Sequence, residues 1–387
     1  MTEITRRTSL QWAVGAALLP PTLSRAAGPV VTMKVGRNQT IKSLAAAAAQ
    51  AKDGMRIEVD AGDYIGDVAA WPQNDLSLRA VDGRVRLIAA GRSAQGKGIF
   101  VTSGERIRIE GFDFSGAVVP DQNGAGIRLE RGSLHLVDCT FNDNENGVLT
   151  SNDKNSRLEV DDCEFGPIVR RAGLNHNIYV GAIGYLRVTG SYFHHGQLGH
   201  LLKSRAAVNH IFYNRLLDGI GGEASYELDF PNGGQALVVG NVIQQSSGTQ
   251  NPHIVSFGEE GYTGPNHELQ LINNTLIDLR PSGGVYLRVA PGPAQVRFIN
   301  NVLAGNPKFN TDGFWQTRNN FVVDLNEFVR AARDDYALRP DSSLRGKAID
   351  PGQSGGINLL QTRQFMPPHG SLALKGPARH PGALQFP

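Results

Sequence analysis

Five short segments share one pattern: Asn177-Ile178-Tyr179-Val180, Leu202-Lys203-Ser204-Arg205, Glu227-Leu228-Asp229-Phe230, Val255-Ser256-Phe257 and Val285-Tyr286-Leu287-Arg288. Each segment reads as a strand centred on an apolar residue, and a turn and a second strand follow it. The second strands end at small or amide residues, which are Ser191, Asn214, Asn241, Asn274 and Asn301. The polar residues that could carry chemistry gather on one side of the first strands.

The same repeat continues toward the N-terminus, where its second strands end at Phe112, Cys139 and Cys163. Successive endings from Phe112 to Asn301 are 27, 24, 28, 23, 27, 33 and 27 residues apart. Short strands at such a period, separated by turns rich in Gly and Asn, are typical of a solenoid. A leucine-rich repeat is excluded because the Leu-x-x-Leu-x-Leu frame is absent and no helical segment recurs. The sequence therefore predicts an all-β coil of parallel strands.

Two columns of equivalent residues should stack inside this coil. Amides at one position of adjacent coils can donate to each other along the axis, so Asn214, Asn241, Asn274 and Asn301 are interpreted as a structural ladder. Cys139 and Cys163 also occupy equivalent positions. Strands about 4.8 Å apart bring such cysteines within disulfide range, but two stacked thiols without a bond fit equally well.

The first 26 residues read as a separate export signal. Arg6 and Arg7 form a twin-arginine pattern, and an apolar segment and a small-residue cleavage site follow it. The predicted destination is the periplasm or the exterior. Residues 1–26 hold three Arg and one Glu, so 38 basic and 36 acidic residues become 35 of each in the mature chain. A neutral chain has no global field that attracts nucleic acid. The sequence contains no run of eighteen apolar residues, so no membrane-spanning helix is predicted.

Residues 27–355 are predicted to form one β-helix domain. Residues 40–52 (TIKSLAAAAAQAK) predict a helix that Thr40 caps and that covers the open end of the stack. Residues 325–333 predict a second short helix. The Pro- and Gly-rich tail, 356–387, should pack on the other end of the stack. A monomer is expected.

These features resemble the right-handed parallel β-helix proteins of carbohydrate metabolism. The resemblance rests on the Ala-rich cap helix, the coil length and the closing Asp335-Tyr336-x-Leu338 and Ala348-Ile349-Asp350-Pro351-Gly352 phrases. It covers nearly all of residues 30–355 and implies a right-handed coil. Polysaccharide lyases, some glycosidases and epimerases share this fold, so the implied partner is a polysaccharide.

Alternation along the first strands predicts which side chains face solvent. If Ile178, Leu202, Leu228, Val255 and Leu287 face inward, the outward set is Asn177, Tyr179, Lys203, Arg205, Glu227, Asp229, Ser256, Tyr286 and Arg288. Rungs about 4.8 Å apart would align Tyr179, Lys203 and Asp229 in a column of roughly 10 Å, about the length of two sugar units.

Leu202-Lys203-Ser204, followed by Asn209 and Asn214, is similar to a stretch of the family 6 polysaccharide lyases. In that family the lysine removes the proton next to a uronate carboxylate, so the resemblance makes Lys203 the candidate base. The family carries acidic calcium ligands seven and five residues before this lysine, where this chain has Gly196 and Leu198. The prediction therefore names no metal ligand and leaves a calcium requirement open.

The other candidate residues each have two interpretations. Tyr179 is a proton donor or acceptor at the glycosidic oxygen, or a platform for a sugar ring. His200 orients or replaces Lys203, or is a corner histidine, and the same holds for His176. Arg205 or Arg288 could neutralise a substrate carboxylate, or could pair with nearby acids. Asn177 and Tyr286 are predicted substrate contacts.

Three functions follow from these residues. A lyase would use Lys203, with Tyr179 and Arg205, on an acidic polysaccharide. A glycoside hydrolase would use Glu227 and Asp229 as acid and base. A glycan-binding protein would use the same face without catalysis, and Lys203 with Asp229 would then be an ordinary surface ion pair. We predict the lyase.

Overall fold

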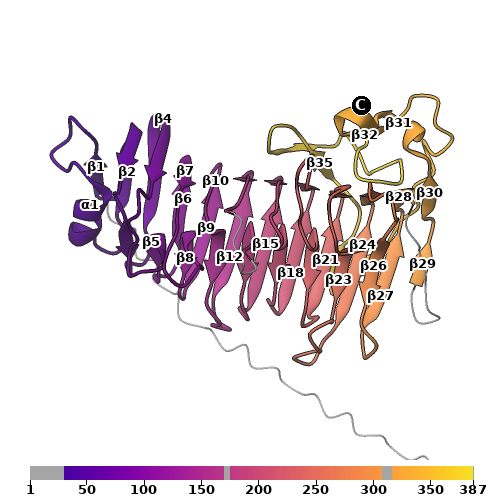
Figure 1. Cartoon of the computed structure of the whole chain (residues 1–387), viewed down its shortest axis with the longest axis horizontal. Helices are drawn as coiled ribbons and strands as arrows, with labels where there is room; N and C mark the ends of the chain where they lie inside the picture. Colours follow the sequence, from indigo (N-terminus) through magenta and orange to yellow (C-terminus); the bar gives the residue numbers. More distant parts are fainter. Residues whose placement is uncertain (1–29, 170–174, 307–315, 387) are drawn as a thin grey trace, which may run out of the picture. The chain divides into compact units, whose positions relative to one another are not determined.

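Parallel β-strands wind into a solenoid in this computed structural model, which describes residues 30–169, 175–306 and 316–386 (Figure 1). The regular structure in these ranges is almost entirely β. The structure confirms the predicted parallel β-helix, whereas its right-handed sense stays an expectation from the resemblance. The predicted export signal lies outside the described residues. No described helix has the length and apolar character to span a bilayer.

One strand from each coil contributes to a nine-stranded parallel sheet, which we call the first sheet. Its strands are β3 (Ala69–Trp71), β5 (Gly98–Thr102), β8 (Ala125–Leu129), β11 (Asn146–Thr150), β14 (Ile178–Val180), β17 (Leu202–Ser204), β20 (Leu228–Phe230), β23 (His253–Phe257) and β26 (Val285–Val289). Ile178, Leu202, Leu228, Val255 and Leu287 are in register and buried. The inward set predicted from the sequence is therefore confirmed.

Two further series of strands complete the coils and are joined into one large sheet by the long β2 and β4. The second series is β1 (Thr32–Val35), β2 (Arg56–Ile65), β4 (Ser77–Ile88), β6 (Ile107–Glu110), β9 (Ser133–Val137), β12 (Arg157–Asp161), β15 (Tyr185–Thr189), β18 (Val208–Phe212), β21 (Gln235–Val239), β24 (Glu268–Ile272), β27 (Gln295–Ile299) and β29 (Gln316–Arg318). The third series is β7 (Phe112–Ser115), β10 (Thr140–Asn142), β13 (Glu164–Phe165), β16 (Tyr192–Phe193), β19 (Arg215–Leu217), β22 (Val242–Gln245), β25 (Thr275–Asp278), β28 (Val302–Gly305) and β30 (Phe321–Val323).

The predicted asparagine ladder lies at the bend between the second and third series. Asn241 Oδ1 accepts the backbone N–H of Asn214 at 2.8 Å and its side-chain amide at 3.0 Å. The Asn241 amide in turn donates to Asn274 Oδ1 at 3.0 Å, and Asn274 donates to Asn301 at 3.1 Å. All four side chains are fully buried. They satisfy backbone groups at a bend where no strand can do so.

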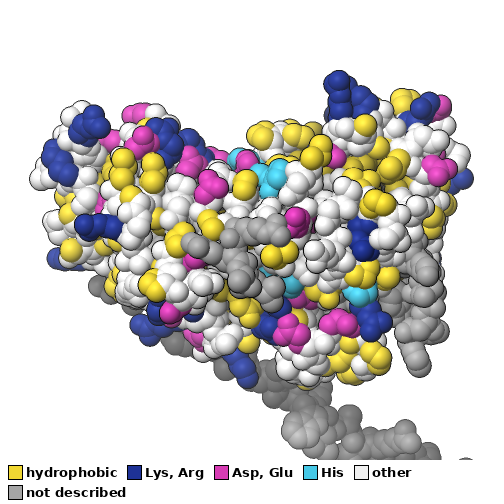
Figure 2. All heavy atoms as spheres, in the orientation of Figure 1, with side chains coloured by type: hydrophobic (Ala, Val, Ile, Leu, Met, Phe, Trp, Pro, Cys, Tyr) yellow, Lys and Arg dark blue, Asp and Glu magenta, His cyan; other side chains and the backbone are white. Residues whose placement is uncertain are grey.

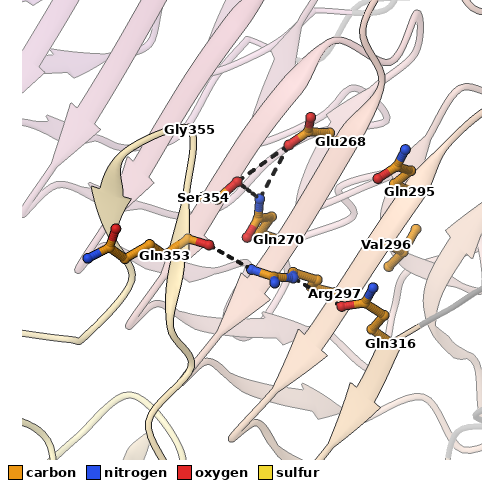
Figure 3. A pocket seen from close by; sticks show the side chains of 9 residues that line it. All are labelled: Glu268, Gln270, Gln295, Val296, Arg297, Gln316, Gln353, Ser354 and Gly355. Carbon is orange, nitrogen blue, oxygen red and sulfur yellow. Dashed lines mark hydrogen bonds between the residues drawn. The ribbon is translucent and has the colours of Figure 1, made fainter. Parts of the chain in front are cut away.

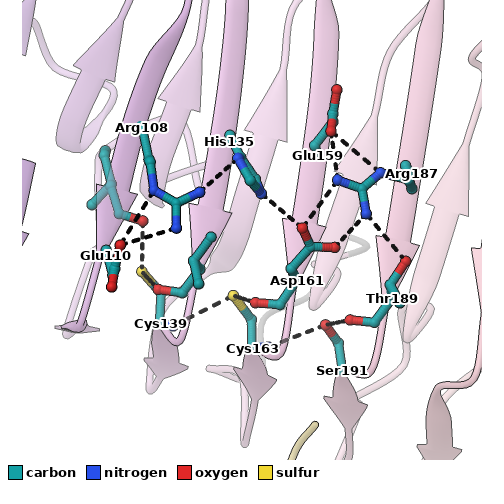
Figure 4. A network of polar contacts seen from close by, with 12 residues as sticks. Arg108, Glu110, His135, Cys139, Glu159, Asp161, Cys163, Arg187, Thr189 and Ser191 are labelled. Atoms are coloured by element: carbon teal, nitrogen blue, oxygen red, sulfur yellow. Dashed lines mark hydrogen bonds and ion pairs between the residues drawn. The ribbon is translucent and has the colours of Figure 1, made fainter. Parts of the chain in front are cut away.

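The same column continues toward the N-terminus with smaller side chains. Ser191 Oγ accepts the N–H of Cys163 at 3.1 Å, and Cys163 Sγ accepts the N–H of Cys139 at 3.4 Å (Figure 4). Both cysteines are buried free thiols in this structure. A stack of Phe rings runs parallel to this column, and Phe141 and Phe165 are 4.7 Å apart with nearly parallel planes. The core is therefore built from columns that repeat one side chain per coil.

A polar network covers the outer face of β6, β9, β12 and β15 (Figure 4). His135 accepts a hydrogen bond from Arg108 at 2.9 Å and contacts Asp161 at 2.7 Å. Arg187 reaches Asp161 at 2.6 Å and Glu159 at 2.5 Å. Charges of opposite sign thus alternate across neighbouring strands, which stabilises a solvent-facing parallel sheet.

The N-terminal helix α1 (Leu44–Gln50) is shorter than the sequence predicted. Ser43, and not Thr40, is its N-cap, with Oγ accepting the N–H of Ala46 at 3.1 Å. Asp67 accepts the N–H groups of the first two helical residues, at 2.6 and 2.9 Å. Leu44 and Ala47 are buried in the core cluster. Ile41 still bridges to Val35, so the helix cannot begin before that residue.

The segment after the last coil differs from the predicted second helix. Instead of one helix over 325–333, it has the 3₁₀ turns η1 (Leu325–Glu327) and η2 (Ala331–Arg333), separated by β31 (Phe328–Arg330). β31 pairs antiparallel with β32 (Asp335–Leu338). This pairing supplies the backbone partners that a helix would otherwise provide.

The C-terminal segment runs along the side of several coils. Its strands are β33 (Gln353–Ser354), β34 (Ile357–Asn358), β35 (Arg363–Phe365) and β36 (Ser371–Ala373). Gly370 donates to the Gly190 carbonyl at 2.6 Å, and Ala383 donates to Thr275 Oγ1 at 2.9 Å. Between β33 and the outer face of β24, β27 and β29 lies a polar pocket of about 400 Å³ (Figure 3). Arg297 spans it by donating to the Gln353 carbonyl at 3.0 Å.

Candidate active site

The outward side of the first sheet carries one column of side chains in exact register. From β8 to β26 it consists of Arg128, Leu149, Tyr179, Lys203, Asp229, Ser256 and Arg288. The predicted alignment of Tyr179, Lys203 and Asp229 is therefore confirmed. One rung separates each member from the next, about 4.8 Å in a parallel sheet.

Lys203 and Arg205 hold one carboxylate between them. Lys203 Nζ lies 2.7 Å from Glu260 Oε1, and Arg205 Nη2 lies 2.5 Å from Glu260 Oε2. Arg205 also donates from Nε to the Tyr179 hydroxyl at 3.0 Å. Lys203 Nζ stands 5.9 Å from the centre of the Tyr179 ring. Two cations and a tyrosine hydroxyl thus converge on the place where a carboxylate is bound.

The fold positions Glu260 through a glycine-bounded loop after β23. Gly258 and Gly261 both have positive φ, at 83° and 90°, which L-residues with side chains rarely adopt. The Glu260 N–H donates to the Pro231 carbonyl at 2.9 Å on the preceding coil. Asn232 of that coil donates to the Gly261 carbonyl at 2.9 Å and accepts from Arg205. The loop is therefore tied to the coil below it.

Asp229 is the second acid of the cluster and is only 2% exposed. Ser256 Oγ donates to its Oδ1 at 2.5 Å. Its Oδ2 lies 3.3 Å from His200 Nε2 and 3.6 Å from Lys203 Nζ. Asp229 therefore stands between a histidine and the candidate base, within reach of both.

His176 and His200 form the inner wall of the cluster. Their rings are 4.8 Å apart, and His176 Nδ1 accepts the backbone N–H of His200 at 2.9 Å. Burial, together with the charges of His200, Lys203 and Arg205, holds the pKa of His176 well below its usual value. His176 is thus a neutral imidazole whose proton sits on Nε2.

Three predicted outward residues face inward, which corrects the sequence analysis. Asn177, Glu227 and Tyr286 are each 0% exposed. Asn177 and Glu227 precede their strands, at the bend where alternation has not begun. Asn177 donates to the carbonyls of Phe165 and Gly166, at 2.9 and 2.8 Å, so it ties the bend together. Burial also raises the pKa of Glu227 well above its usual value, and burial raises that of Tyr286.

Arg288 lies at the far end of the column, three rungs from Lys203. Its side chain is 47% exposed and donates from Nε to Glu259 Oε1 at 3.0 Å. It does not join the cluster around Lys203. The structure therefore brings together Tyr179, His176, His200, Lys203, Arg205 and Asp229 and leaves Arg288 apart.

Sequence reasoning missed Glu260, Ser256 as a partner of Asp229, and Asn232. The only available signal for Glu260 was the Gly258-Glu259-Glu260-Gly261 turn directly after a strand of the first sheet. A loop that returns over the preceding coil places Glu260 against Lys203, although 57 residues separate the two in sequence. Spacing within one repeat cannot reveal such a contact.

The described residues around Lys203 do not fit a calcium site. Gly196 and Leu198 offer no side-chain oxygen, and Asp229 and Glu260 are bound to cations of the protein itself. Among the described residues, no group of three or more His, Cys, Asp or Glu side chains is arranged to hold a metal. We therefore derive no step through a metal ion.

Comparison with known proteins supports the fold. Neither a protein-family model nor a curated protein matches the sequence. Among solved structures, the chain is similar to the pectate lyase Pel9A, with a TM-score of 0.57 and 13% identity over 92% of this chain and 97% of that one. It also matches a family 6 polysaccharide lyase from Pseudopedobacter saltans, with a TM-score of 0.41 and 12% identity over 85% and 99% of the two chains. The likeness to Pel9A supports the parallel β-solenoid fold of this chain.

Proposed function

We propose that this protein is a lyase that cleaves a uronate-containing polysaccharide by β-elimination. The observation that carries the proposal is the bound carboxylate of Glu260, which Lys203 and Arg205 contact at 2.7 and 2.5 Å. A uronate carboxylate that displaces Glu260 would find the same two cations. The proton to be removed sits on the carbon next to that carboxylate, so the substrate would present it to this cluster.

The reaction needs a base, an acid and neutralisation of the carboxylate. In our proposal Lys203 takes the proton next to the carboxylate, and the C–H electron pair becomes a C=C bond. The C–O bond on the neighbouring carbon breaks, and the leaving oxygen takes a proton. Tyr179 can give that proton, because Arg205 Nε donates to its oxygen and leaves the hydroxyl hydrogen free.

Lys203 can act as a base only after it has lost its own proton. Asp229 Oδ2 lies 3.6 Å from Lys203 and 3.3 Å from His200. In our proposal this carboxylate passes the proton of Lys203 toward His200 before each turnover.

Hydrolysis by a Glu227–Asp229 pair has no structural basis here. Glu227 is fully buried and Asp229 is held by Ser256, so the two carboxyls cannot flank a glycosidic bond. A glycan-binding protein without catalysis is the second candidate. The complete pairing of Lys203 and Arg205 with Asp229 and Glu260 favours it, because such pairs also occur on inert surfaces.

A screen of uronate polysaccharides, with and without a chelator, tests the proposal. A lyase produces new ultraviolet absorbance from the C=C bond, whereas a hydrolase produces reducing ends without that absorbance. A binding protein gives neither signal but retards the polymer in a native gel. If polyuronates bind but none is cleaved, the lyase proposal is wrong and the glycan-binding function is favoured.

A further inference from the structure

A second polar hollow lies next to the Lys203 cluster, over β8, β11 and β14. Its volume is about 500 Å³. Its lining includes Arg128 from β8, Leu149 and Thr150 from β11, and His176 and Tyr179 at β14. Because Tyr179 and His176 also belong to the Lys203 cluster, the hollow opens directly onto the candidate active site.

Two mostly buried residues on the lining of this hollow, His176 and Asn146, carry side-chain hydrogen-bond donors. His176 is 4% exposed, and its Nδ1 is occupied by the His200 N–H, so Nε2–H is the donor left over. Asn146 is equally buried, and its Oδ1 accepts the His176 N–H at 3.0 Å. In the described part of the chain, neither His176 Nε2 nor Asn146 Nδ2 has a hydrogen-bond partner. These two donor atoms are the accessible ends of otherwise buried side chains, so water or a ligand in the hollow can meet them.

Arg128 supplies the positive charge of this hollow, and Asp121 adds a carboxylate to its lining. Its Nε donates to Glu130 Oε1 at 2.9 Å, and Glu130 is also neutralised by Lys97 at 3.1 Å. Within the described ranges, the two terminal nitrogens of Arg128 have no hydrogen-bond partner. A guanidinium that is oriented through Nε and open at its terminal edge is suited to a bidentate contact with a carboxylate.

The register places Arg128 at a fixed distance from the candidate base. Arg128, Leu149, Tyr179 and Lys203 occupy successive rungs of one column. Three rungs span about 14 Å, which is roughly the length of three linked pyranose rings. Leu149 and the Tyr179 ring lie between the two cations and provide an apolar floor for sugar faces.

We propose that this hollow binds further sugar units of the same polysaccharide chain, with Arg128 contacting a uronate carboxylate about three units from the one held by Lys203 and Arg205. The inference rests on the proposed function and specifies its substrate. The substrate is a polyuronate that lies along the solenoid axis and extends from Lys203 toward β8. The side-chain donors of His176 and Asn146 meet hydroxyl groups of the intervening sugars.

Steady-state kinetics on oligogalacturonates and alginate oligomers of defined length test this assignment. We expect Arg128→Gln to raise KM for a hexamer by roughly tenfold or more, the usual effect of losing one charge-assisted contact. KM for a dimer and kcat for both should stay within about twofold. The matched control is Arg106→Gln, which removes an exposed arginine paired with Asp75 elsewhere on the solenoid.

Two kinetic results would overturn the assignment. One is a hexamer KM that Arg128→Gln leaves unchanged. The other is a larger KM increase in Arg288→Gln, which would place the chain on the opposite side of Lys203. Circular dichroism melting of each variant shows whether the fold is intact. If the Arg128→Gln protein does not fold, Arg128→Lys gives the same test, because it keeps the charge and loses the bidentate geometry.

A binding experiment separates this inference from the proposed function. Native-gel retardation by uncleaved polygalacturonate and alginate is measured for the wild type and for Arg128→Gln. If no polyuronate is cleaved but Arg128→Gln loses retardation, the result supports sugar binding in the hollow and contradicts the lyase activity. If both proteins are retarded equally, the result contradicts sugar binding through Arg128, whether or not cleavage occurs.

Discussion

Lys203 is the residue on which the proposed chemistry depends, although it sits between two carboxylates. Its Nζ lies 2.7 Å from Glu260 and 3.6 Å from Asp229. An ion pair of this kind is common on surfaces and contributes little to stability when exposed. The ion pair of Lys203 differs from such surface pairs because Tyr179, His200 and Arg205 lie in the same cluster.

We expect Lys203→Ala to lower turnover of a polyuronate by about 10²–10⁴-fold, the usual contribution of a positioned acid or base. The melting temperature should also fall, because Lys203 is only 7% exposed and its removal takes one cation away from the buried Asp229. Turnover by ultraviolet absorbance and melting by circular dichroism give both quantities. Full activity of the variant would remove Lys203 from the mechanism.

Glu227 shows how a buried carboxyl can make stability depend on pH. Its carboxyl is fully buried, and burial and the charge of Asp218 hold its pKa well above the usual value. The folded protein therefore keeps a proton that the unfolded chain releases above about pH 4. The contribution of Glu227 to stability is therefore greatest below that pH and falls as pH rises toward the folded pKa.

Glu227→Gln should remove this loss, because an amide does not ionise. We expect the variant to gain melting temperature relative to the wild type at pH 8 and to gain little or nothing at pH 4. Thermal melts across this pH range measure the difference. An equal shift at every pH would mean that the substitution acts through packing and not through ionisation.

At the scale of the elements, the amide ladder holds the bend between the second and third strand series. Asn241 accepts two hydrogen bonds from Asn214 and donates to Asn274 and to the Ile211 carbonyl. Ser191 at the equivalent position makes one of these contacts, because its Oγ accepts the backbone N–H of Cys163 in the preceding coil. The ladder therefore needs an acceptor at each level, and the amide adds a donor.

Asn241→Leu should lower the free energy of unfolding by about 3 kcal/mol or more, because it leaves several buried groups without partners. Asn241→Ser should cost less, because its hydroxyl can still accept the Asn214 N–H. Urea unfolding of the two variants measures both costs. Equal costs for Leu and Ser would contradict a hydrogen-bonding role for the ladder.

At the scale of the whole molecule, basic and acidic side chains balance in number after residue 26. Basic and acidic side chains are interspersed on the face shown in Figure 2. This agrees with the neutral formal charge of residues 27–387, which contain 35 basic and 35 acidic residues. Recognition of a polyanion by this protein must therefore be local, as in the cluster of Lys203 and Arg205.

We propose that the protein acts outside the cytoplasm, after export through the twin-arginine route. Replacing Arg6 and Arg7 by Lys should leave uncleaved precursor in the cytoplasm, because a receptor reads the arginine pair. Fractionation and immunoblotting of wild type and variant show the two forms. Normal processing of the double variant would refute the route without affecting the proposed reaction.

The sequence by itself predicted the coil, its inward column from Ile178 to Leu287 and the ladder from Asn214 to Asn301. These features repeat once per coil, so local periodicity determines them. It also predicted the column of Tyr179, Lys203 and Asp229, because a parallel register aligns equivalent positions.

Only the tertiary structure decided where the ends of the strands point and which loop covers the site. Asn177 and Glu227 precede their strands at a bend, where alternation does not hold, so they turn inward. Glu260 reaches Lys203 through a loop that returns over the preceding coil. Such contacts depend on the path of a turn, and periodicity carries no information about that path.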